Sequence, residues 1–187
     1  MVLKPLERQL YNDDDFEAFL KLPENREHLF ELIEGEIVEK MVTVEHGIIA
    51  ALFATFINLY LFNNPIGWVA VESRHRPAKD KRNDRLPDVS FSLNEHPITT
   101  RGAAPYIPEL CIEIQSPDDS AKQLADKATF YLANGAKMVW LVYPSKQLVE
   151  TLTLDDRELL GVEDTIDGGD LLPGFKLPVK QVFPTVQ

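Results

Sequence analysis

The chain has 187 residues, of which 44% are hydrophobic and 26% charged, and this composition excludes wholesale disorder and a fibrous design. Its length is near that of one ordinary domain, so we expect residues 1–187 to form a single domain whose core needs no disulfide. The formal net charge of -11 argues against a protein that coats nucleic acid non-specifically, because neutralising phosphates requires clustered lysine and arginine.

The cellular setting is indicated by cysteine usage and by the apolar segments. Cys111 is the single cysteine, and its place among apolar neighbours in 110–112 predicts a small buried hydrophobe rather than a nucleophile or ligand. The start of the chain lacks the long apolar core of a secretory signal. The longest apolar stretch, 47–62, contains Thr55 and Asn58 and is shorter than the ~20 residues that cross a bilayer. We therefore expect a cytoplasmic protein with no membrane partner, and a buried helix at 47–62.

The first half of the chain predicts two helices and three strands. Acidic residues open the segment 11–20, which favours a short helix because they suit a helix N-terminus. Apolar and acidic residues alternate over 30–39 around Gly35, which indicates two short strands and a tight connection. The segment 45–62 predicts the main early helix, packed on a sheet, and 67–73 predicts the next strand.

A polar loop is predicted over 74–86, and it holds most of the local positive charge. Six basic and two acidic residues between Arg74 and Arg85 give a local balance of +4, and the stretch runs directly into Pro87 and Asp88. Two interpretations stay open: a solvated loop, or a loop that contacts phosphate beside a functional site.

Strands and a helix follow in the second half. The alternation in 89–93 predicts a strand with Asp88 at its start, and 110–114 predicts an apolar strand in which Glu113 is the exception. Ser116, with proline and acids after it, predicts the start of a helix that runs to about Asn134.

The end of the chain looks structural. A strand is predicted over 138–143, with 147–154 as its hairpin partner, and the turn-rich tail is expected to close one edge of the fold.

Four residues carry the candidate chemistry. Asp88 and Glu113, brought together from separate strands, can hold a divalent cation through oxygen ligands. Gln115 lies on the same strand face as Glu113 by the period of two, so its amide can reach a metal-bound water or a phosphate. Lys127 lies at the margin of the apolar stripe of its helix and can supply positive charge. The alternative is that Asp88 caps a turn, Glu113 ends a solvated strand and Lys127 lies on a wet helix face.

Other polar residues could extend the cluster. Tyr131 lies one turn after Lys127 and could hydrogen-bond within the cluster, or it could be a core aromatic residue. Glu36, Glu45 and His46 could border the same cleft.

The ordered motifs resemble the PD-(D/E)XK nuclease superfamily, and most closely its Uma-type branch of restriction endonucleases. The matching pieces are 30–36, 45–47, 86–89, 113–117, Lys127 with Tyr131 and Gly135, 139–142 and 172–175. The resemblance implies an α/β fold with a restriction-endonuclease-like core, in which helices flank a mixed central β-sheet. It also implies metal held by Asp88 and Glu113, and DNA as substrate. Gln115 departs from the pattern, because lysine is usual there; either Lys127 has taken over its charge or the site is weakened.

Three functions follow from these observations. The first is a Mg²⁺-dependent DNA endonuclease, with Mn²⁺ as a substitute, in which Asp88 and Glu113 bind metal, Lys127 stabilises phosphate and Gln115 orients water or ligand. The second is a nucleic-acid-binding or regulatory module on the same fold, without turnover. The third is a small-molecule hydrolase that uses the same carboxylates. A homodimer is plausible for the first, because two related sites can cut both strands.

Overall fold

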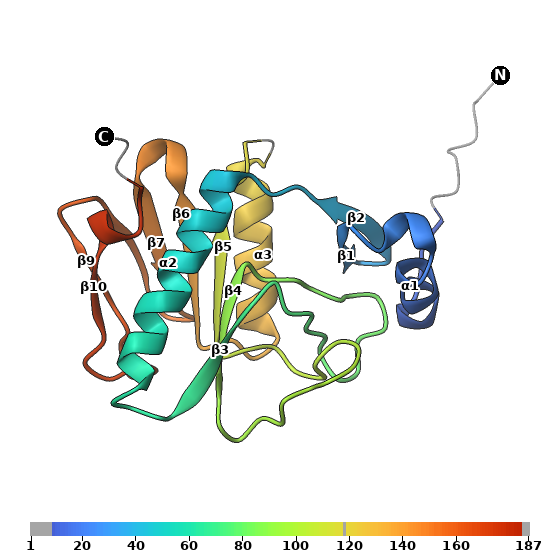
Figure 1. Cartoon of the computed structure of the whole chain (residues 1–187), viewed down its shortest axis with the longest axis horizontal. Helices are drawn as coiled ribbons and strands as arrows, with labels where there is room; N and C mark the ends of the chain where they lie inside the picture. The colour runs from blue at the N-terminus through green and yellow to red at the C-terminus, as the bar shows by residue number, and fades with distance from the viewer. Residues whose placement is uncertain (1–8, 118, 185–187) are drawn as a thin grey trace.

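The computed structural model describes residues 9–117 and 119–184. A six-stranded sheet lies at its centre, in the order β3-β4-β5-β6-β7-β8, with helix α2 (Val44–Leu61) on one face and helix α3 (Ala121–Ala133) on the other (Figure 1). The strands are β3 (Gly67–Val71), β4 (Val89–Leu93), β5 (Leu110–Ile114), β6 (Met138–Tyr143), β7 (Leu148–Leu152) and β8 (Arg157–Leu160).

The sheet is mixed, because one of its five pairings differs from the rest. Strands β5 and β6 are parallel, and α3 forms the crossover between them, while the other neighbours in the sheet are antiparallel. The predicted α/β fold with a mixed central sheet flanked by helices is confirmed.

Strand alternation separates two apolar layers. On the α2 side, Phe53 packs with Phe91 and Trp140, all fully buried. On the α3 side, Tyr131 packs in a cluster that contains Cys111, which is fully buried, as predicted. Burial raises the pKa of the Cys111 thiol well above its usual value, so the thiol is not an activated nucleophile.

Helix α2 is long and apolar enough, by length and composition, to cross a membrane. In the structure one of its faces packs on the sheet, whereas Val44, Leu59 and the following Phe62 are exposed. The prediction of a buried helix therefore holds for one face of α2 only.

A separate small unit precedes α2 in the chain. Helix α1 (Asp13–Leu20) begins with a capping box made by Asn12, and strands β1 (Leu29–Ile33) and β2 (Glu36–Lys40) form an antiparallel hairpin. Glu34 and Gly35 connect the strands with φ of 51° and 89°, the left-handed values that a two-residue hairpin turn requires. The predicted helix, strands and tight connection are confirmed.

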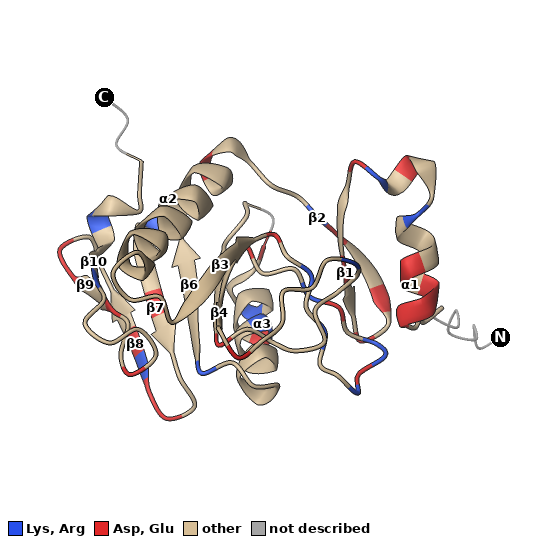
Figure 2. Cartoon of the chain, turned by 60° about the horizontal axis from the view of Figure 1, so that its bottom comes forward, with Lys and Arg blue, Asp and Glu red and all other residues tan. Residues whose placement is uncertain are grey.

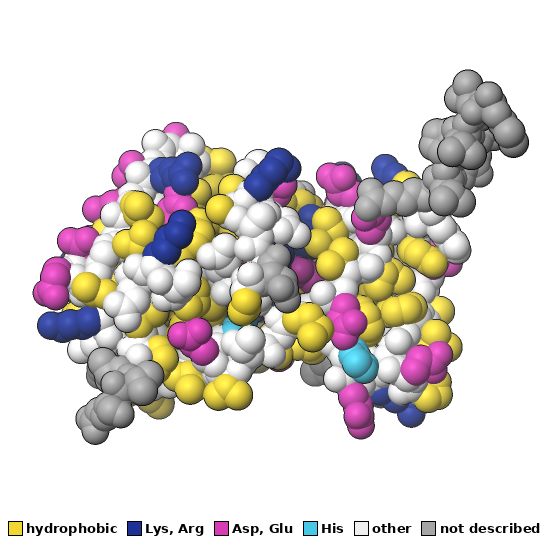
Figure 3. Space-filling model, turned by 90° about the horizontal axis from the view of Figure 1, so that it is seen from above, with side chains coloured by type: hydrophobic (Ala, Val, Ile, Leu, Met, Phe, Trp, Pro, Cys, Tyr) yellow, Lys and Arg dark blue, Asp and Glu magenta, His cyan; other side chains and the backbone are white. Residues whose placement is uncertain are grey.

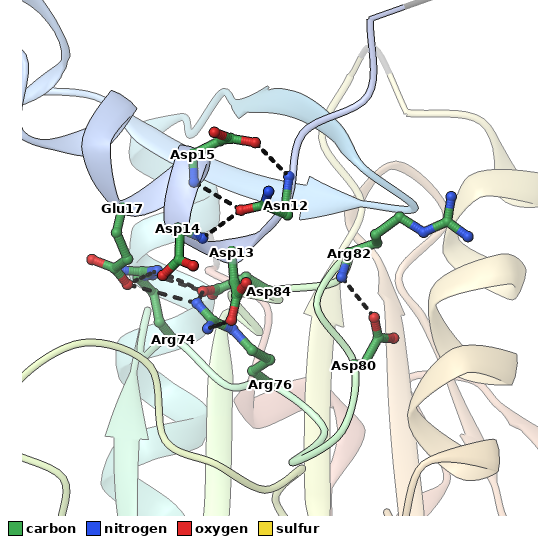
Figure 4. Close-up of polar contacts among 10 residues, drawn as sticks. All are labelled: Asn12, Asp13, Asp14, Asp15, Glu17, Arg74, Arg76, Asp80, Arg82 and Asp84. Carbon is green, nitrogen blue, oxygen red and sulfur yellow. Dashed lines mark hydrogen bonds and ion pairs between the residues drawn. The ribbon is translucent and has the colours of Figure 1, made fainter.

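An ion-pair network attaches this unit to the loop before β4 (Figure 4). Asp84 is fully buried and accepts hydrogen bonds from Arg74 Nη2 at 2.5 Å and Arg76 Nη2 at 2.8 Å. The same arginines reach Glu17 and Asp13 on α1, whose acidic first turn is visible in Figure 2. The idea of a merely solvated basic loop is wrong for these two arginines, because carboxylates already neutralise them.

Helix α3 begins later than the sequence indicated. Its N-cap is Ser120, whose hydroxyl accepts from Gln123 N–H while the Gln123 side chain accepts from Ser120 N–H. Ser116 instead donates its hydroxyl hydrogen to the Met41 carbonyl, and the capping box decides the start. The predicted start at Ser116 is wrong, while the predicted end holds, with C-cap Asn134 before a glycine at φ 116°. Asp118, part of the predicted start, lies outside the described residues.

The C-terminal part closes the α2 side of the fold. The β6–β7 hairpin is confirmed, and a second hairpin, β9 (Thr165–Asp167) with β10 (Lys176–Pro178), follows β8. Phe175 stacks on Trp140 at 6.0 Å between ring centroids. Three short 3₁₀ helices, η1 (Pro23–Asn25), η2 (Pro144–Lys146) and η3 (Val179–Gln181), complete the elements.

Candidate active site

The pairing of β4 with β5 brings the two predicted carboxylates together. Val89 pairs with Ile112, so one further step along the antiparallel register sets Asp88 opposite Glu113. Side chains at opposite positions of an antiparallel pair share a face and lie close together. The sequence placed both acids at strand ends, and the strand register explains why those ends meet.

Asp88 is buried and held from three directions. Its Oδ2 accepts a hydrogen bond from Ile114 N–H at 2.6 Å, its Oδ1 forms an ion pair with Lys40, and His46 Nε2 lies 2.9 Å from the same oxygen. Burial alone would raise the pKa of Asp88, but Lys40 and then His46 outweigh burial, and the pKa falls to about 2. Asp88 therefore carries a negative charge at neutral pH.

Glu113 has a different environment although it lies beside Asp88. Its Oε1 accepts a hydrogen bond from the Tyr131 hydroxyl at 2.6 Å, and its Oε2 lies 2.9 Å from Lys127 Nζ. Burial raises the pKa of Glu113, and Lys127 and Lys40 reduce that rise without cancelling it. Both alternatives considered for Tyr131 are present, because its hydroxyl bonds to the cluster and its ring is fully buried in the core.

Lys127 bridges two elements. Its ammonium lies 3.0 Å from Glu31 Oε2 as well as 2.9 Å from Glu113 Oε2. Burial works against its charge, but Glu113 and Glu31 prevail and raise the pKa of Lys127 above its usual value. Lys127 therefore remains a cation, suited to stabilising negative charge and unsuited to acting as a base.

The hairpin contributes two residues that were not among the predicted site residues, Glu31 and Lys40. Glu31 Oε1 accepts a hydrogen bond from Leu86 N–H at 2.9 Å, and Lys40 donates to the Leu86 carbonyl at 2.6 Å. Both polar groups of one peptide segment, two residues before Asp88, are thus held by the hairpin. Glu31 is an acid on a strand with buried neighbours, the same signal that singled out Glu113, whereas Lys40 gave no such signal.

The remaining candidates separate clearly. His46 contacts Asp88, which agrees with the suggestion that it borders the cleft. Its neighbour Glu45 is exposed. Gln115 follows the end of β5, and its Nε2 donates to the Asp119 carbonyl at 2.9 Å. The amide of Gln115 is therefore engaged in the turn before α3, whereas the carboxylates of Asp88 and Glu113 are engaged with the lysines.

A pocket of about 840 Å³ opens beside this cluster, between the hairpin and α3. Figure 3 looks down on this side of the molecule, and charged side chains are visible in the hollow between its two halves. The charged residues that line the pocket are Glu31, Glu34, Glu39, Lys40, Arg85, Glu113, Asp119, Asp126 and Lys127. Acids outnumber bases there, so an anionic substrate needs added positive charge to enter.

Three carboxylates of the cluster are donors of the kind that suits a hard divalent cation, although they do not form a trio of ligand atoms within 4.8 Å of one another among the described residues. Glu31, Asp88 and Glu113 offer carboxylate oxygens, the ligands that Mg²⁺ prefers. Asp88 Oδ1 is buried against two basic groups, the Lys40 ammonium and His46 Nε2 at 2.9 Å, so a cation held at this oxygen would take the place that Lys40 occupies.

A second acidic group lies elsewhere. Glu95, His96 and Glu109 have ligand atoms within 4.8 Å of one another, the one such trio in the part of the chain that the structure describes. His96 Nε2 lies 2.8 Å from Glu109 Oε1, and Glu109 Oε2 accepts from Leu93 N–H. Leu93 ends β4, so this trio lies at the opposite end of the β4–β5 pair from Asp88 and Glu113.

Comparisons with known proteins indicate a nuclease family and its fold. A family model named Uma2 and described as "Putative restriction endonuclease" matches residues 16–180. A crystal structure of a putative nuclease belonging to DUF820 from Anabaena variabilis superposes with a TM-score of 0.77 at 26% identity, covering 92% of this chain and 97% of that one. No curated protein matches the chain.

Proposed function

Since the chain belongs to the Uma2 restriction endonuclease family, we propose that it is a Mg²⁺-dependent DNA endonuclease whose active site is the Asp88–Glu113 cluster. The observation that carries the proposal is the meeting of these two carboxylates with Lys127 beside an open pocket. Mn²⁺ is expected to substitute for Mg²⁺, because both take oxygen ligands.

Each residue has a distinct task in this proposal. Asp88, whose pKa is about 2, and Glu113 would hold the cation. Glu31, which forms an ion pair with Lys127, would be a third oxygen donor. When bound, the metal would neutralise phosphate charge and lower the pKa of a water molecule. Lys127 would hold negative charge that develops on the phosphate as water adds to phosphorus and the bond to one ester oxygen breaks. Tyr131 is a positioning residue, because it fixes one oxygen of Glu113.

The excess of acids around the pocket supports the dependence on metal. Without a cation, the phosphates of DNA would approach a cluster whose lysines are already paired with carboxylates. Like charges at short range repel strongly in a partly buried site. Binding of DNA and of metal should therefore reinforce one another.

The test is nicking of supercoiled plasmid in Mg²⁺ or Mn²⁺. Asp88→Asn and Glu113→Gln should each lower cleavage at least 100-fold, as loss of a metal ligand does. The matched control is Glu150→Gln, which alters a glutamate of the same sheet that is equally buried and also accepts from a tyrosine, but outside the site. Cleavage that survives in Asp88→Asn, or that needs no metal, contradicts the proposal.

Two observations favour a second candidate, a DNA-binding module without turnover. Lys40 contacts the Asp88 oxygen that a metal would use, and Gln115 stands where the resembling superfamily usually has lysine. This candidate predicts DNA binding with no nicking in any divalent metal. Titration of the purified protein with Mn²⁺ separates the two, since only the nuclease needs a metal bound at Asp88.

A further inference from the structure

Arg85 differs from the other cations of the pocket. Among the described residues that line the pocket, the cations are Lys40, Arg85 and Lys127, and each lysine forms an ion pair with a carboxylate of the cluster. Arg85 has no carboxylate within ion-pair distance in 9–117 and 119–184. Of these three cations, Arg85 is therefore the one that no described carboxylate pairs with directly.

The side chain of Arg85 is buried and held in a fixed orientation. The residue is 5% exposed, its Nη2 donates to Asn83 Oδ1 at 3.1 Å, and its buried Nε has no hydrogen-bond partner in the described part. Its guanidinium carbon lies 4.1 Å from the centre of the Phe130 ring. Asn83 is itself held by Asp80 through a 2.7 Å hydrogen bond.

An unpaired buried charge is costly, so its presence in a pocket points to a ligand. Removing an arginine from water without an anionic partner costs several kcal/mol, and stacking on an aromatic ring recovers part of that. The chain pairs comparable arginines when their role is structural: Arg74 and Arg76 both reach the buried Asp84. The Arg85 side chain is held in one orientation, but no described carboxylate forms an ion pair with it.

The chemistry of the missing partner follows from the guanidinium. A planar fork of N–H donors matches the oxygens of phosphate, which can accept two parallel hydrogen bonds. Phe130, beneath Arg85, lies three residues along α3 from Lys127, an axial rise of about 4.5 Å. The ring beneath Arg85 is therefore displaced along α3 from Lys127, so Arg85 and Lys127 can contact different phosphates.

We propose that Arg85 binds a backbone phosphate of the DNA strand next to the phosphate held at Asp88 and Glu113. This inference rests on the proposed nuclease function and adds a binding subsite to it. The competing role for Arg85 is a remote counter-charge for Glu31. Burial opposes ionisation of Glu31, and Lys127, Lys40 and then Arg85 act in the other direction to lower its pKa.

Equilibrium binding distinguishes these roles. The dissociation constant of a short DNA duplex would be measured by fluorescence anisotropy in Ca²⁺, at several salt concentrations, for wild type, Arg85→Gln and Arg85→Lys. The control is Arg157→Gln, which removes the same charge from strand β8 at the far edge of the sheet. Circular dichroism and urea unfolding establish that each variant folds.

Arg85→Gln should weaken binding about tenfold or more and reduce the slope of log K against log salt by about 0.9. Arg85→Lys should keep that slope yet bind about fivefold more weakly, because lysine lacks the fork. Turnover in Mg²⁺ at saturating DNA should stay at the wild-type level in the Arg157→Gln control, which lies outside the pocket.

Several results would overturn the subsite. Equal binding by Arg85→Gln and Arg157→Gln, or a loss of turnover in Arg85→Gln at unchanged affinity, removes the proposed contact. If Arg85→Gln does not fold, the affinity of Arg85→Lys for DNA is the test. Wild-type affinity in Arg85→Lys would rule out a two-donor contact between the Arg85 guanidinium and phosphate. If the wild-type protein binds DNA through Arg85 but does not cut it, the proposed nuclease activity is wrong and the Arg85 subsite stands. If the wild-type protein does not bind DNA, both proposals are wrong.

Discussion

Replacing Tyr131 by phenylalanine separates the positioning of Glu113 from general stability. The change removes a single hydroxyl that is fully buried and donates to Glu113 Oε1 at 2.6 Å. A hydrogen bond to a charged group contributes about 1.5–3 kcal/mol. Glu113 keeps Lys127 at its other oxygen, so we expect a loss of about 2 kcal/mol in the free energy of unfolding.

The chain offers a matched control in Tyr143→Phe. The Tyr143 hydroxyl donates to Glu150 Oε2 at 2.9 Å, and Glu150, like Glu113, is buried and keeps a basic partner, here Arg157. The two variants delete the same kind of bond from the same sheet, one inside the candidate site and one outside it.

The assay is urea unfolding together with plasmid nicking at saturating Mg²⁺. Both variants should shift the unfolding midpoint by about 1 M, since small proteins have slopes of about 1–3 kcal/mol per molar urea. Only Tyr131→Phe should also reduce the cleavage rate, by about tenfold, and raise the Mg²⁺ concentration needed for half-maximal cleavage. Equal cleavage by the two variants, or a Tyr131→Phe midpoint equal to that of wild type, would refute the reasoning.

Three further predictions concern the framework that holds the site. Asp84→Asn leaves Arg74 and Arg76 without their buried partner and should lower the free energy of unfolding in urea by about 3 kcal/mol. The control is Asp167→Asn, which changes an exposed aspartate and should leave the unfolding midpoint unchanged. Equal midpoints for the two variants would show that the network does not stabilise the fold. Burial lowers the pKa of His75 to about 4, so between pH 6.5 and 4 the unfolded chain binds a proton at His75 that the folded chain does not. As the pH falls through this window, the free energy of unfolding should fall by about 3 kcal/mol. His75→Gln should lose less stability over the same range, as unfolding midpoints at pH 7 and pH 4 would show. Ser120→Ala should cost about 1 kcal/mol by removing the α3 cap, and Ser120→Asp should restore most of it; equal midpoints for both would argue against the cap.

Local signals in the sequence were enough for most elements and for Asp88, Glu113 and Lys127 of the cluster, but not for Glu31 and Lys40. Period-two alternation located β4 and a nearly continuous apolar run located β5, and the acids at their ends stood out because each interrupts or precedes an apolar run. The start of α3 was misplaced because two serines compete there, and the reciprocal bonds between Ser120 and Gln123 favour the later one. Pattern alone cannot rank two plausible caps four residues apart.

The basic loop shows where local signals fail. Its net charge of +4 left open a solvated loop or a loop that contacts phosphate, yet Arg74 and Arg76 form ion pairs with acids that lie 57 and 63 residues away in sequence. Arg85 from the same stretch faces the pocket without a carboxylate partner. Ion pairs with residues distant in sequence determine which of several similar basic residues is left without a carboxylate partner. These ion pairs form only when α1 and the β1–β2 hairpin pack against the loop before β4.

The contribution of the hairpin follows the same logic and explains how the site is assembled. Leu32 exchanges two backbone hydrogen bonds with Asp84, and this isolated bridge sets Glu31 and Lys40 against Leu86. The carboxylates at the ends of β4 and β5 would exist without the hairpin, but the ammonium at Asp88 and the second acid at Lys127 would not. The charge state of the candidate site thus depends on a contact between segments 52 residues apart, Leu32 and Asp84, so a change that loosens the hairpin should alter metal binding before it unfolds the sheet.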